Sequence, residues 1–285
     1  MKAYWRYLFM PSTPWFHLTH RGILRLTGAD CLKLLQGLVT NDVNLASEDR
    51  VIYSLLLSPQ GRFQHDFFIG QNGIGEFFLT PELSRIDDLI KKLSMYKLKS
   101  DVAIENISAD FFLVWQPHES TNTPGTILQA PPSLIFIDPR NTAMGMHALV
   151  PKGDFSEDFA LYHRKRLTLG IPEGSLDMIV DKAIPLENNM DDLNAISWTK
   201  GCYMGQELTS RTKHVGEVRK KLFPVVVEGP LPTFDASLFY RDEEVGLFKS
   251  GFEKRGLALI RIENLEGISK EGLSGPSNSK IFIAF

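Results

Sequence analysis

The C-terminal part of the chain differs in pattern from the rest, and this difference constrains the fold more than any other feature. From Leu222 onward the sequence consists of short β-like runs separated by Gly, Pro and charged residues: LFPVVVEG, ASLFY, EEVGLFKS, LALIRI and KIFIAF. Many short strands with turn residues between them are typical of a small β-barrel or sandwich. We therefore predict a C-terminal β-barrel domain over residues 222–285 and a separate core over residues 1–221.

The core mixes strand and helix patterns, which indicates the α+β class. Alternating apolar residues predict strands, and apolar residues spaced by three and four predict helices. Residues 116–133 hold four prolines and one glycine, so we predict a loop or an internal boundary between two lobes there. The predicted core strands are 15–27, 51–57, 62–69, 76–80, 101–107, 111–115, 134–138 and 145–150, and the predicted helices are 30–38, 81–93 and 154–169.

The composition argues against several classes of protein. The chain has 285 residues, a net charge of −3 and 43% apolar residues. It can therefore bury a full core and has no general attraction for nucleic acid or membranes. No apolar run approaches the ~20 residues of a membrane span, and the first residues lack the features of a signal peptide; either Met1 or Met10 could be the start. Two cysteines fit a reducing compartment, the cytoplasm or, in a eukaryote, the mitochondrial matrix.

The stretch KGCYMGQELTSRT, residues 200–212, holds one of the two cysteines between two glycines. A thiol reacts as its thiolate, and nearby cations favour that form. Cys202 is therefore either a working thiol, activated by Lys200 or Arg211, or a small buried side chain in a tight turn. Cys31 lies on the apolar stripe of the predicted helix 30–38, and we expect it to be an inert core residue.

Three stretches together resemble one protein family. The string KGCYMGQE followed by SRT, the segment RLTGADCLKLLQGLVTNDV and the segment LLSPQGRFQHDFF are similar to the YgfZ-type folate-binding proteins. That family is related to the aminomethyltransferase (T-protein) of the glycine cleavage system and acts in iron–sulfur protein maturation. The resemblance weakens after about Phe223. It implies a two-lobed core around a central folate cavity, a C-terminal β domain that closes it, and iron–sulfur proteins or assembly factors as partners.

The resemblance also implies a cofactor site. Tetrahydrofolate would lie in the central cavity near Asp66, whose oxygens can accept hydrogen bonds from pterin N–H groups. Asn41 and Asp42 would lie at the edge of this pocket. From the residues alone, Asp66 is better interpreted as a solvent-facing carboxylate, while Asn41 and Asp42 are also common turn residues.

The motif stretch and the residues after it carry the remaining implied roles. Cys202 would be an exposed working thiol, and Glu207 would orient its neighbours by hydrogen bonding. Arg211 opens the basic segment 211–221, which would attract the glutamate tail of a folate. The alternative for this segment is a solvated strand edge. Two cysteines cannot supply the four thiolates usual for an iron–sulfur cluster, so any cluster contact would be transient or shared.

Two enzymatic alternatives stay open. A folate-dependent aminomethyl transferase would use Asp66 near the reacting nitrogen, but Thr168 stands where the T-proteins carry a pterin-binding Glu. A thiol enzyme would need a His base for Cys202, and His214 is the nearest in sequence. The basic cluster 163–166 is either a solvated helix face or the source of an Arg for a folate carboxylate. We expect no specific metal site, since the carboxylates of 177–192 do not follow the EF-hand pattern.

Overall fold

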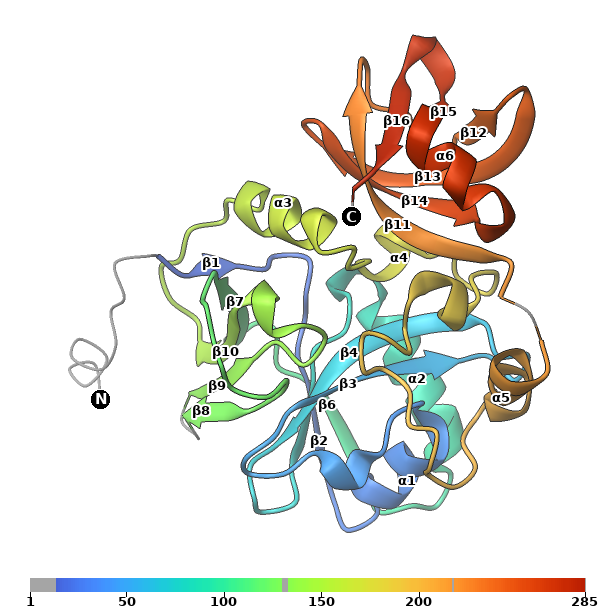
Figure 1. The fold of residues 1–285 in the computed structure, drawn as a ribbon. Helices are drawn as coiled ribbons and strands as arrows, with labels where there is room; N and C mark the ends of the chain where they lie inside the picture. The colour runs from blue at the N-terminus through green and yellow to red at the C-terminus, as the bar shows by residue number, and fades with distance from the viewer. Residues whose placement is uncertain (1–13, 130–132, 217, 285) are drawn as a thin grey trace.

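The computed structural model describes residues 14–129, 133–216 and 218–284 of the chain. The first residues, on which the expected absence of a signal peptide and the choice of start depend, lie outside the described part up to residue 13. Within the described part, no helix is long and apolar enough to cross a membrane. The fold has two five-stranded antiparallel sheets and a closed β-barrel (Figure 1).

The first sheet is covered on one face by two helices, α1 and α2. Both helices turn their apolar stripes toward the sheet, and Cys31 on α1 is only 1% exposed, which confirms its predicted place in the core. Asp30 stands at the N-terminal cap position of α1, but its side chain makes no capping hydrogen bond and accepts the backbone N–H of Asp101. In sheet order the strands are β3 (Ile52–Leu57), β4 (Phe63–Gln71), β5 (Phe77–Leu79), β2 (Leu24–Thr27) and β6 (Ala103–Asn106), and the helices are α1 (Cys31–Leu38) and α2 (Ile86–Lys97).

The second sheet packs against the other face of the first. Side chains such as Phe68 of β4 and Trp115 of β7 share one core between the sheets. Strands β3 and β4 are therefore buried on both faces. In sheet order the strands are β1 (Phe16–His17), β7 (Phe111–Gln116), β10 (Met146–Pro151), β9 (Leu134–Ile137) and β8 (Ile127–Gln129).

The chain crosses from the first sheet to the second between Asn106 and Phe111. This crossing comes ahead of the internal boundary predicted near residues 116–133, which lies within the second sheet. Residues 117–126 connect β7 to β8 without a named strand or helix, as the proline and glycine content predicted, but residues 127–129 within the same range form β8. A loop between strands of one sheet has the same composition as a linker. The N-terminal strand β1 also belongs to this second sheet, because it pairs with β7.

Three helices lie between the second sheet and the barrel in the sequence. They are α3 (Ala160–Thr168), α4 (Gly174–Asp177) and α5 (Gln206–His214). Gly170 has φ +70° just past the end of α3, the left-handed position that glycine favours at helix ends. Short 3-10 helices complete the connections: η2 (Val43–Leu45), η3 (Leu83–Arg85), η4 (Thr142–Met144), η5 (Pro185–Asn188), η6 (Ile262–Asn264) and η7 (Pro276–Asn278).

The C-terminal strands close into a barrel, as predicted, and the α+β class is confirmed. A helix that the sequence patterns did not predict, α6 (Leu265–Glu271), buries Ile268 in the barrel core. It is short and lies between strand-like runs, so its pattern was not distinct. In barrel order the strands are β11 (Lys220–Glu228), β14 (Arg255–Arg261), β13 (Glu243–Phe252), β12 (Ser237–Tyr240), β15 (Leu273–Ser274) and β16 (Lys280–Ile283).

Candidate functional site

Cys202 lies in an exposed loop directly before α5. The alternative of a buried thiol in a tight turn is therefore excluded. Gly201 has open space where a side chain would stand, whereas a Cβ on Gly205 would lie 2.6 Å from the backbone oxygen of Ser58. Gly205 also has φ +81°, a conformation that glycine adopts without strain. This close contact seats the start of α5 on the turn between β3 and β4.

Lys200 is directed at the end of α1. Its Nζ donates to the backbone oxygens of Val39 and Asn41, both at 2.8 Å. Lys200 is 7% exposed, and burial lowers the pKa of its ammonium group to about 8. Two carbonyl groups therefore occupy its donors, and this geometry gives no support to the predicted activation of Cys202 by Lys200.

Glu207 and Arg211 stand exposed on α5. Neither side chain forms an ion pair or hydrogen bond with another residue in the described ranges, so their predicted roles stay predictions. Within the basic segment 211–221, Lys213 pairs with Asp191 at 2.9 Å and Lys221 pairs with Asp192 at 2.8 Å. These pairs neutralise part of the patch that was expected to attract an anionic ligand.

His214 lies at the far end of α5 from Cys202. The helix spans Gln206–His214, and a rise of 1.5 Å per residue separates its ends by roughly 12 Å. The His214 ring packs instead against Trp198, with ring centroids 6.1 Å apart. A base must lie within hydrogen-bond reach of its nucleophile, so the structure does not bring Cys202 and His214 together as a catalytic pair.

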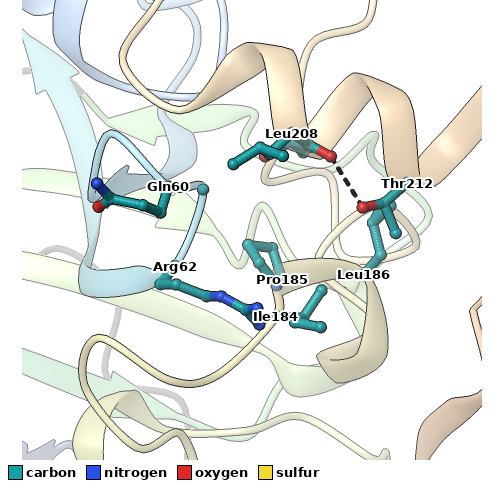
Figure 2. Close-up of a pocket in the computed structure, with 9 residues that line it drawn as sticks. Gln60, Arg62, Ile184, Pro185, Leu186, Leu208 and Thr212 are labelled. Carbon is teal, nitrogen blue, oxygen red and sulfur yellow. Dashed lines mark hydrogen bonds between the residues drawn. The ribbon is translucent and has the colours of Figure 1, made fainter. Parts of the chain in front are cut away.

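A small pocket opens beside α5 (Figure 2). It has a volume of about 100 Å³ and lies between the β3–β4 turn, the segment 184–186 and the helix. The hydroxyl of Thr212 on its wall donates to the backbone oxygen of Leu208 at 2.8 Å. The pocket is small beside the roughly 300–1,000 Å³ typical of ligand sites. Its lining residues are Gln60, Gly61, Arg62, Ile184, Pro185, Leu186, Leu208, Thr209 and Thr212.

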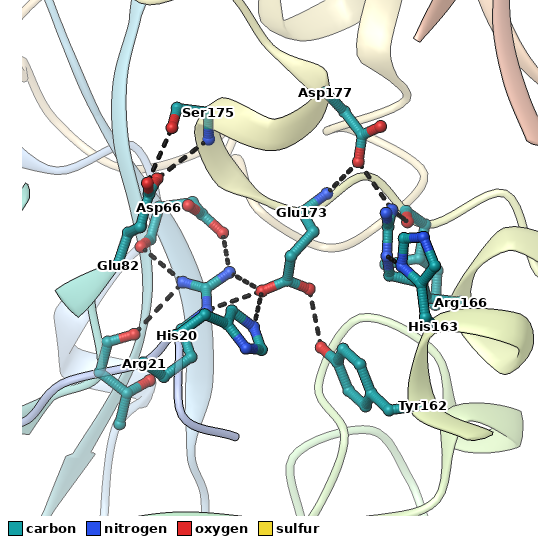
Figure 3. A network of polar contacts seen from close by, with 12 residues as sticks. His20, Arg21, Asp66, Glu82, Tyr162, His163, Arg166, Glu173, Ser175 and Asp177 are labelled. Atoms are coloured by element: carbon teal, nitrogen blue, oxygen red, sulfur yellow. Dashed lines mark hydrogen bonds and ion pairs between the residues drawn. The ribbon is translucent and has the colours of Figure 1, made fainter. Parts of the chain in front are cut away.

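Asp66 lies at the centre of the core and is 1% exposed. Its Oδ2 accepts a hydrogen bond from Arg21 Nη2 at 2.7 Å (Figure 3). The same oxygen accepts from the Tyr53 hydroxyl at 2.9 Å. Arg21 Nη1 also donates to the backbone oxygens of Asp66 and Thr80 at 3.1 and 3.3 Å. The carboxylate therefore faces the interior and is paired, and the interpretation as a solvent-facing strand residue is wrong.

Glu173 extends this polar cluster (Figure 3). Its Oε1 accepts from Arg21 Nε at 2.7 Å and contacts His20 Nε2 at 3.0 Å, while its Oε2 accepts from the Tyr162 hydroxyl at 2.7 Å. Burial would raise the pKa of Glu173, but Arg21 and His20 hold it well below its usual value. The sequence reasoning missed Glu173. Its only local signal was a carboxylate between Pro172 and Gly174 next to apolar residues.

Arg140 joins the second sheet to the same cluster. Its guanidinium donates to Asp138 at 2.8 and 3.1 Å, and its Nη1 lies 3.4 Å from Glu173. The group also stacks over the rings of Tyr53 and Phe68, at 5.5 and 5.0 Å from their centroids. Burial would raise the pKa of Asp138, but Arg140 lowers it far below its usual value. The cluster thus ties both sheets to the segment that follows α3.

These contacts bear directly on the expected folate site. Oδ2 of Asp66, one of the two oxygens that could accept a pterin N–H, already binds Arg21 and Tyr53. Phe68 and Arg140 surround the same group, and the four neighbours of Asp66 are all buried: Arg21, Tyr53, Phe68 and Arg140. A pterin bound through Oδ2 would have to displace Arg21 or Tyr53, so the surroundings of this oxygen do not fit a folate as they stand.

Asn41 and Asp42 lie shortly after the end of α1, where Asn41 contacts the backbone of Tyr53. Asn41 lines a cavity of about 180 Å³ whose wall includes neither Asp42 nor Asp66, so a place for Asn41 at the edge of a folate pocket stays a prediction. The Asn41 amide donates to the backbone oxygens of Tyr53 and Asn194, both at 2.8 Å. Asp42 instead accepts the backbone N–H of Asn44 at 3.1 Å at the start of η2. Both side chains thus support the local fold.

The basic cluster on α3 is divided between two environments: Arg164 is exposed and pairs with Glu253, as a solvated helix face would have it, whereas Arg166 is in the interior. Arg166 is fully buried, and its guanidinium binds Asp177 at 2.6 Å and the hydroxyl of Ser250 in the barrel at 3.0 Å. It therefore fixes the barrel to the core. Thr168 is exposed and donates to the backbone oxygen of Arg164 at 2.8 Å. Among the residues that the structure describes, no group of three or more His, Cys, Asp or Glu is arranged to hold a metal ion.

Comparisons with known proteins agree with this architecture. Residues 12–115 match the model of the GCVT N-terminal domain, and residues 219–276 match that of the CAF17 C-terminal beta-barrel domain. The crystal structure of the glycine cleavage system aminomethyltransferase T from Bartonella henselae superimposes with a TM-score of 0.75 over 96% of this chain and 85% of that chain. Its sequence identity is 12%, so this likeness concerns the fold alone, and it confirms the predicted T-protein-like architecture.

Several curated proteins are similar over most of the chain. The mitochondrial iron–sulfur cluster assembly factor IBA57 of Mus musculus is 35% identical, over 88% of this chain and 78% of its own length. The protein of the same name from Homo sapiens is 34% identical over the same shares. The mitochondrial homologue from Mycosarcoma maydis is 29% identical, over 92% of this chain and 76% of its own length.

Proposed function

The chain belongs to the family of IBA57 iron–sulfur cluster assembly factors, and we propose that it assists the maturation of iron–sulfur proteins through the thiol of Cys202. This membership agrees with the predicted link to iron–sulfur maturation and to the T-protein, while the narrower YgfZ-type assignment stays a prediction. Because the relatives are named as mitochondrial proteins, we propose the mitochondrion as its place of work.

The contrast between the two cysteines is the observation that carries this proposal. Cys202 is exposed, whereas Cys31, the first residue of α1, is buried. Iron–sulfur clusters are held mainly by cysteine thiolates, usually four of them, and this chain has a single accessible one. A cluster that binds Cys202 must therefore take its remaining ligands from a second molecule. The partner we propose is an iron–sulfur protein or an assembly factor that shares the cluster with Cys202 for a limited time.

The family resemblance also predicts that the protein depends on folate. The match to the GCVT N-terminal domain favours it, since T-proteins use tetrahydrofolate, while the engaged carboxylate of Asp66 counts against it. The same engagement counts against an aminomethyl transferase, which would need Asp66 at the reacting nitrogen. We therefore propose the thiol as the working group and derive no step through folate.

The test uses cells that lack their own IBA57 protein. They receive the full native chain, Cys202→Ser or Cys31→Ala, and the activities of iron–sulfur enzymes are measured in extracts. We expect Cys202→Ser to lower the restored activity by about tenfold or more, because loss of even an outer-shell partner costs about 10–100-fold. We expect Cys31→Ala to restore the activity. Anaerobic incubation of the chain with ferrous iron, sulfide and a small thiol, followed by circular dichroism, reports whether a cluster binds at Cys202. Full restoration by Cys202→Ser would refute the proposal.

A further inference from the structure

The segment that carries Cys202 is laid along one short strip at the end of α1. The strip is residues 37–41, and the segment is residues 194–204. Backbone and side-chain hydrogen bonds join them at intervals: Asn41 Nδ2 to Asn194 O at 2.8 Å, Thr40 Oγ1 to Ala195 O at 2.6 Å, Ser197 N to Thr40 O at 3.0 Å, Lys200 Nζ to Val39 O and Asn41 O at 2.8 Å, and Met204 N to Gly37 O at 3.2 Å.

Cys202 sits between the last two of these contacts. Lys200 holds the loop on its N-terminal side, and the backbone of Met204 holds it on the other. Tyr203 is buried, and its ring lies 5.2 Å from the Lys200 Nζ. Gly201 and Cys202 are the exposed residues between these fixed points. The thiol is therefore presented at the top of a short loop that is held on both sides.

Lys200 makes contacts that an apolar residue could not make. Val39 caps the end of α1, where free carbonyl groups carry the partial negative charge of the helix dipole, and a cation there also satisfies unpaired acceptors. Burial of an ammonium group is costly unless hydrogen bonds offset it. An apolar side chain would fill the same space without a buried charge. The donors of Lys200 therefore serve to bind the loop to the carbonyl groups of Val39 and Asn41.

We propose that Lys200 is the positioning residue for Cys202, and that it holds the loop so that the thiol meets a cluster shared with a second protein. This inference rests on the proposed function. A metal site requires its ligands within roughly 0.5 Å of their places, and loss of a group that orients a ligand lowers metal affinity by about 10–100-fold. Alkylation of an exposed thiol by a small reagent has no such geometric requirement.

The experiment compares the full native chain with Lys200→Met, Lys200→Arg and Cys202→Ser. Methionine has a similar length but no donor, whereas arginine keeps the donors. For each variant we measure thermal unfolding, the rate of Cys202 alkylation by iodoacetamide at fixed pH, and the restored iron–sulfur enzyme activity in cells without their own IBA57 protein.

We expect the Cys202 thiol of Lys200→Met to be alkylated within about twofold of the native rate. We expect Lys200→Met to lower the restored enzyme activity by about tenfold. Lys200→Arg should recover most of this activity. Three results would overturn the proposal: full activity of Lys200→Met, a loss that merely follows its unfolded fraction, or alkylation slowed by about tenfold, which would make Lys200 an activator of the thiolate. Full activity of Cys202→Ser would instead refute the proposed function itself, so the two failures are distinguishable.

Discussion

The guanidinium of Arg21 lies 2.7 Å from the carboxylate of Asp66, across 45 residues of sequence. The same guanidinium binds Glu173, which is 152 residues away from it. Arg21 therefore neutralises two carboxylates that belong to different parts of the core. All three side chains are buried, so each depends on the others for its charge balance and its hydrogen bonds.

Removal of Arg21 should destabilise the chain strongly. In Arg21→Met the carboxylates of Asp66 and Glu173 lose their main cation, and breaking a buried pair costs about 3–5 kcal/mol. The matched control is Arg25→Met, because Arg25 pairs with Glu105 at the surface and exposed pairs contribute about 1 kcal/mol or less. Urea unfolding measures both free energies. Equal losses in the two variants would contradict the central role of Arg21.

Tetrahydrofolate should give no binding heat with the native chain in titration calorimetry. The physical reason is that Asp66 Oδ2 already accepts from Arg21 and Tyr53. The comparison uses Asp66→Asn, with Asp87→Asn on the exposed face of α2 as a control for charge. Micromolar binding that Asp66→Asn loses and Asp87→Asn keeps would show that the cluster opens for a ligand and would restore the folate hypothesis.

Only one of the two thiols should react rapidly with iodoacetamide in the folded protein. Cys202 is exposed, while Cys31 is buried and burial raises the pKa of its thiol. Mass spectrometry of the alkylated peptides after short exposure should therefore find the label at Cys202, and at Cys31 only after unfolding.

Because His214 lies at the far end of α5, His214→Gln should leave the pH dependence of the Cys202 alkylation rate unchanged. A changed profile would bring the Cys–His pair back.

Acid should weaken the fold in part through His65. Burial lowers the pKa of His65 to about 4, whereas an unfolded histidine titrates near 6.5. Between these values the unfolded chain binds more protons than the folded chain, so the free energy of unfolding falls as the pH drops through this window. The contribution is up to roughly 3 kcal/mol. His65→Gln should flatten the fall between pH 6.5 and 4, and an identical slope in native and variant chains would count against it.

Local patterns predicted the elements but not the contacts between them. The apolar stripe of α1, with Cys31, Leu35 and Leu38 in the core, followed from helical spacing, and the barrel followed from its short strands. The direction of Asp66 did not follow, since alternation along a strand buried on both faces carries no information about which side is solvent. The residue types of the cysteine motif left a working thiol and a buried thiol equally open, and only the family resemblance favoured the working thiol.

The long-range pairs were out of reach of such reasoning. Arg21 and Glu173 are single charged residues in apolar surroundings, and nothing in their spacing indicates that they meet. The same holds for Lys200, whose acceptors are backbone oxygens 161 and 159 residues earlier in the chain. Every residue type has a backbone carbonyl oxygen, so the residue types in the sequence do not indicate which of them supplies an acceptor.

The position of the N-terminal strand has a consequence for how the chain is made. Strand β1 pairs with β7, and Arg21 needs Glu173. The ribosome releases Arg21 long before Glu173 appears, by roughly 8–30 s at 5–20 residues per second. During that time Asp66 and then β7 (Phe111–Gln116) are synthesised, and Glu173, the second carboxylate that Arg21 binds, comes last. The segment can therefore gain its first partners early, but the complete hydrogen-bond network around Arg21 can form only after residue 173 has left the ribosome.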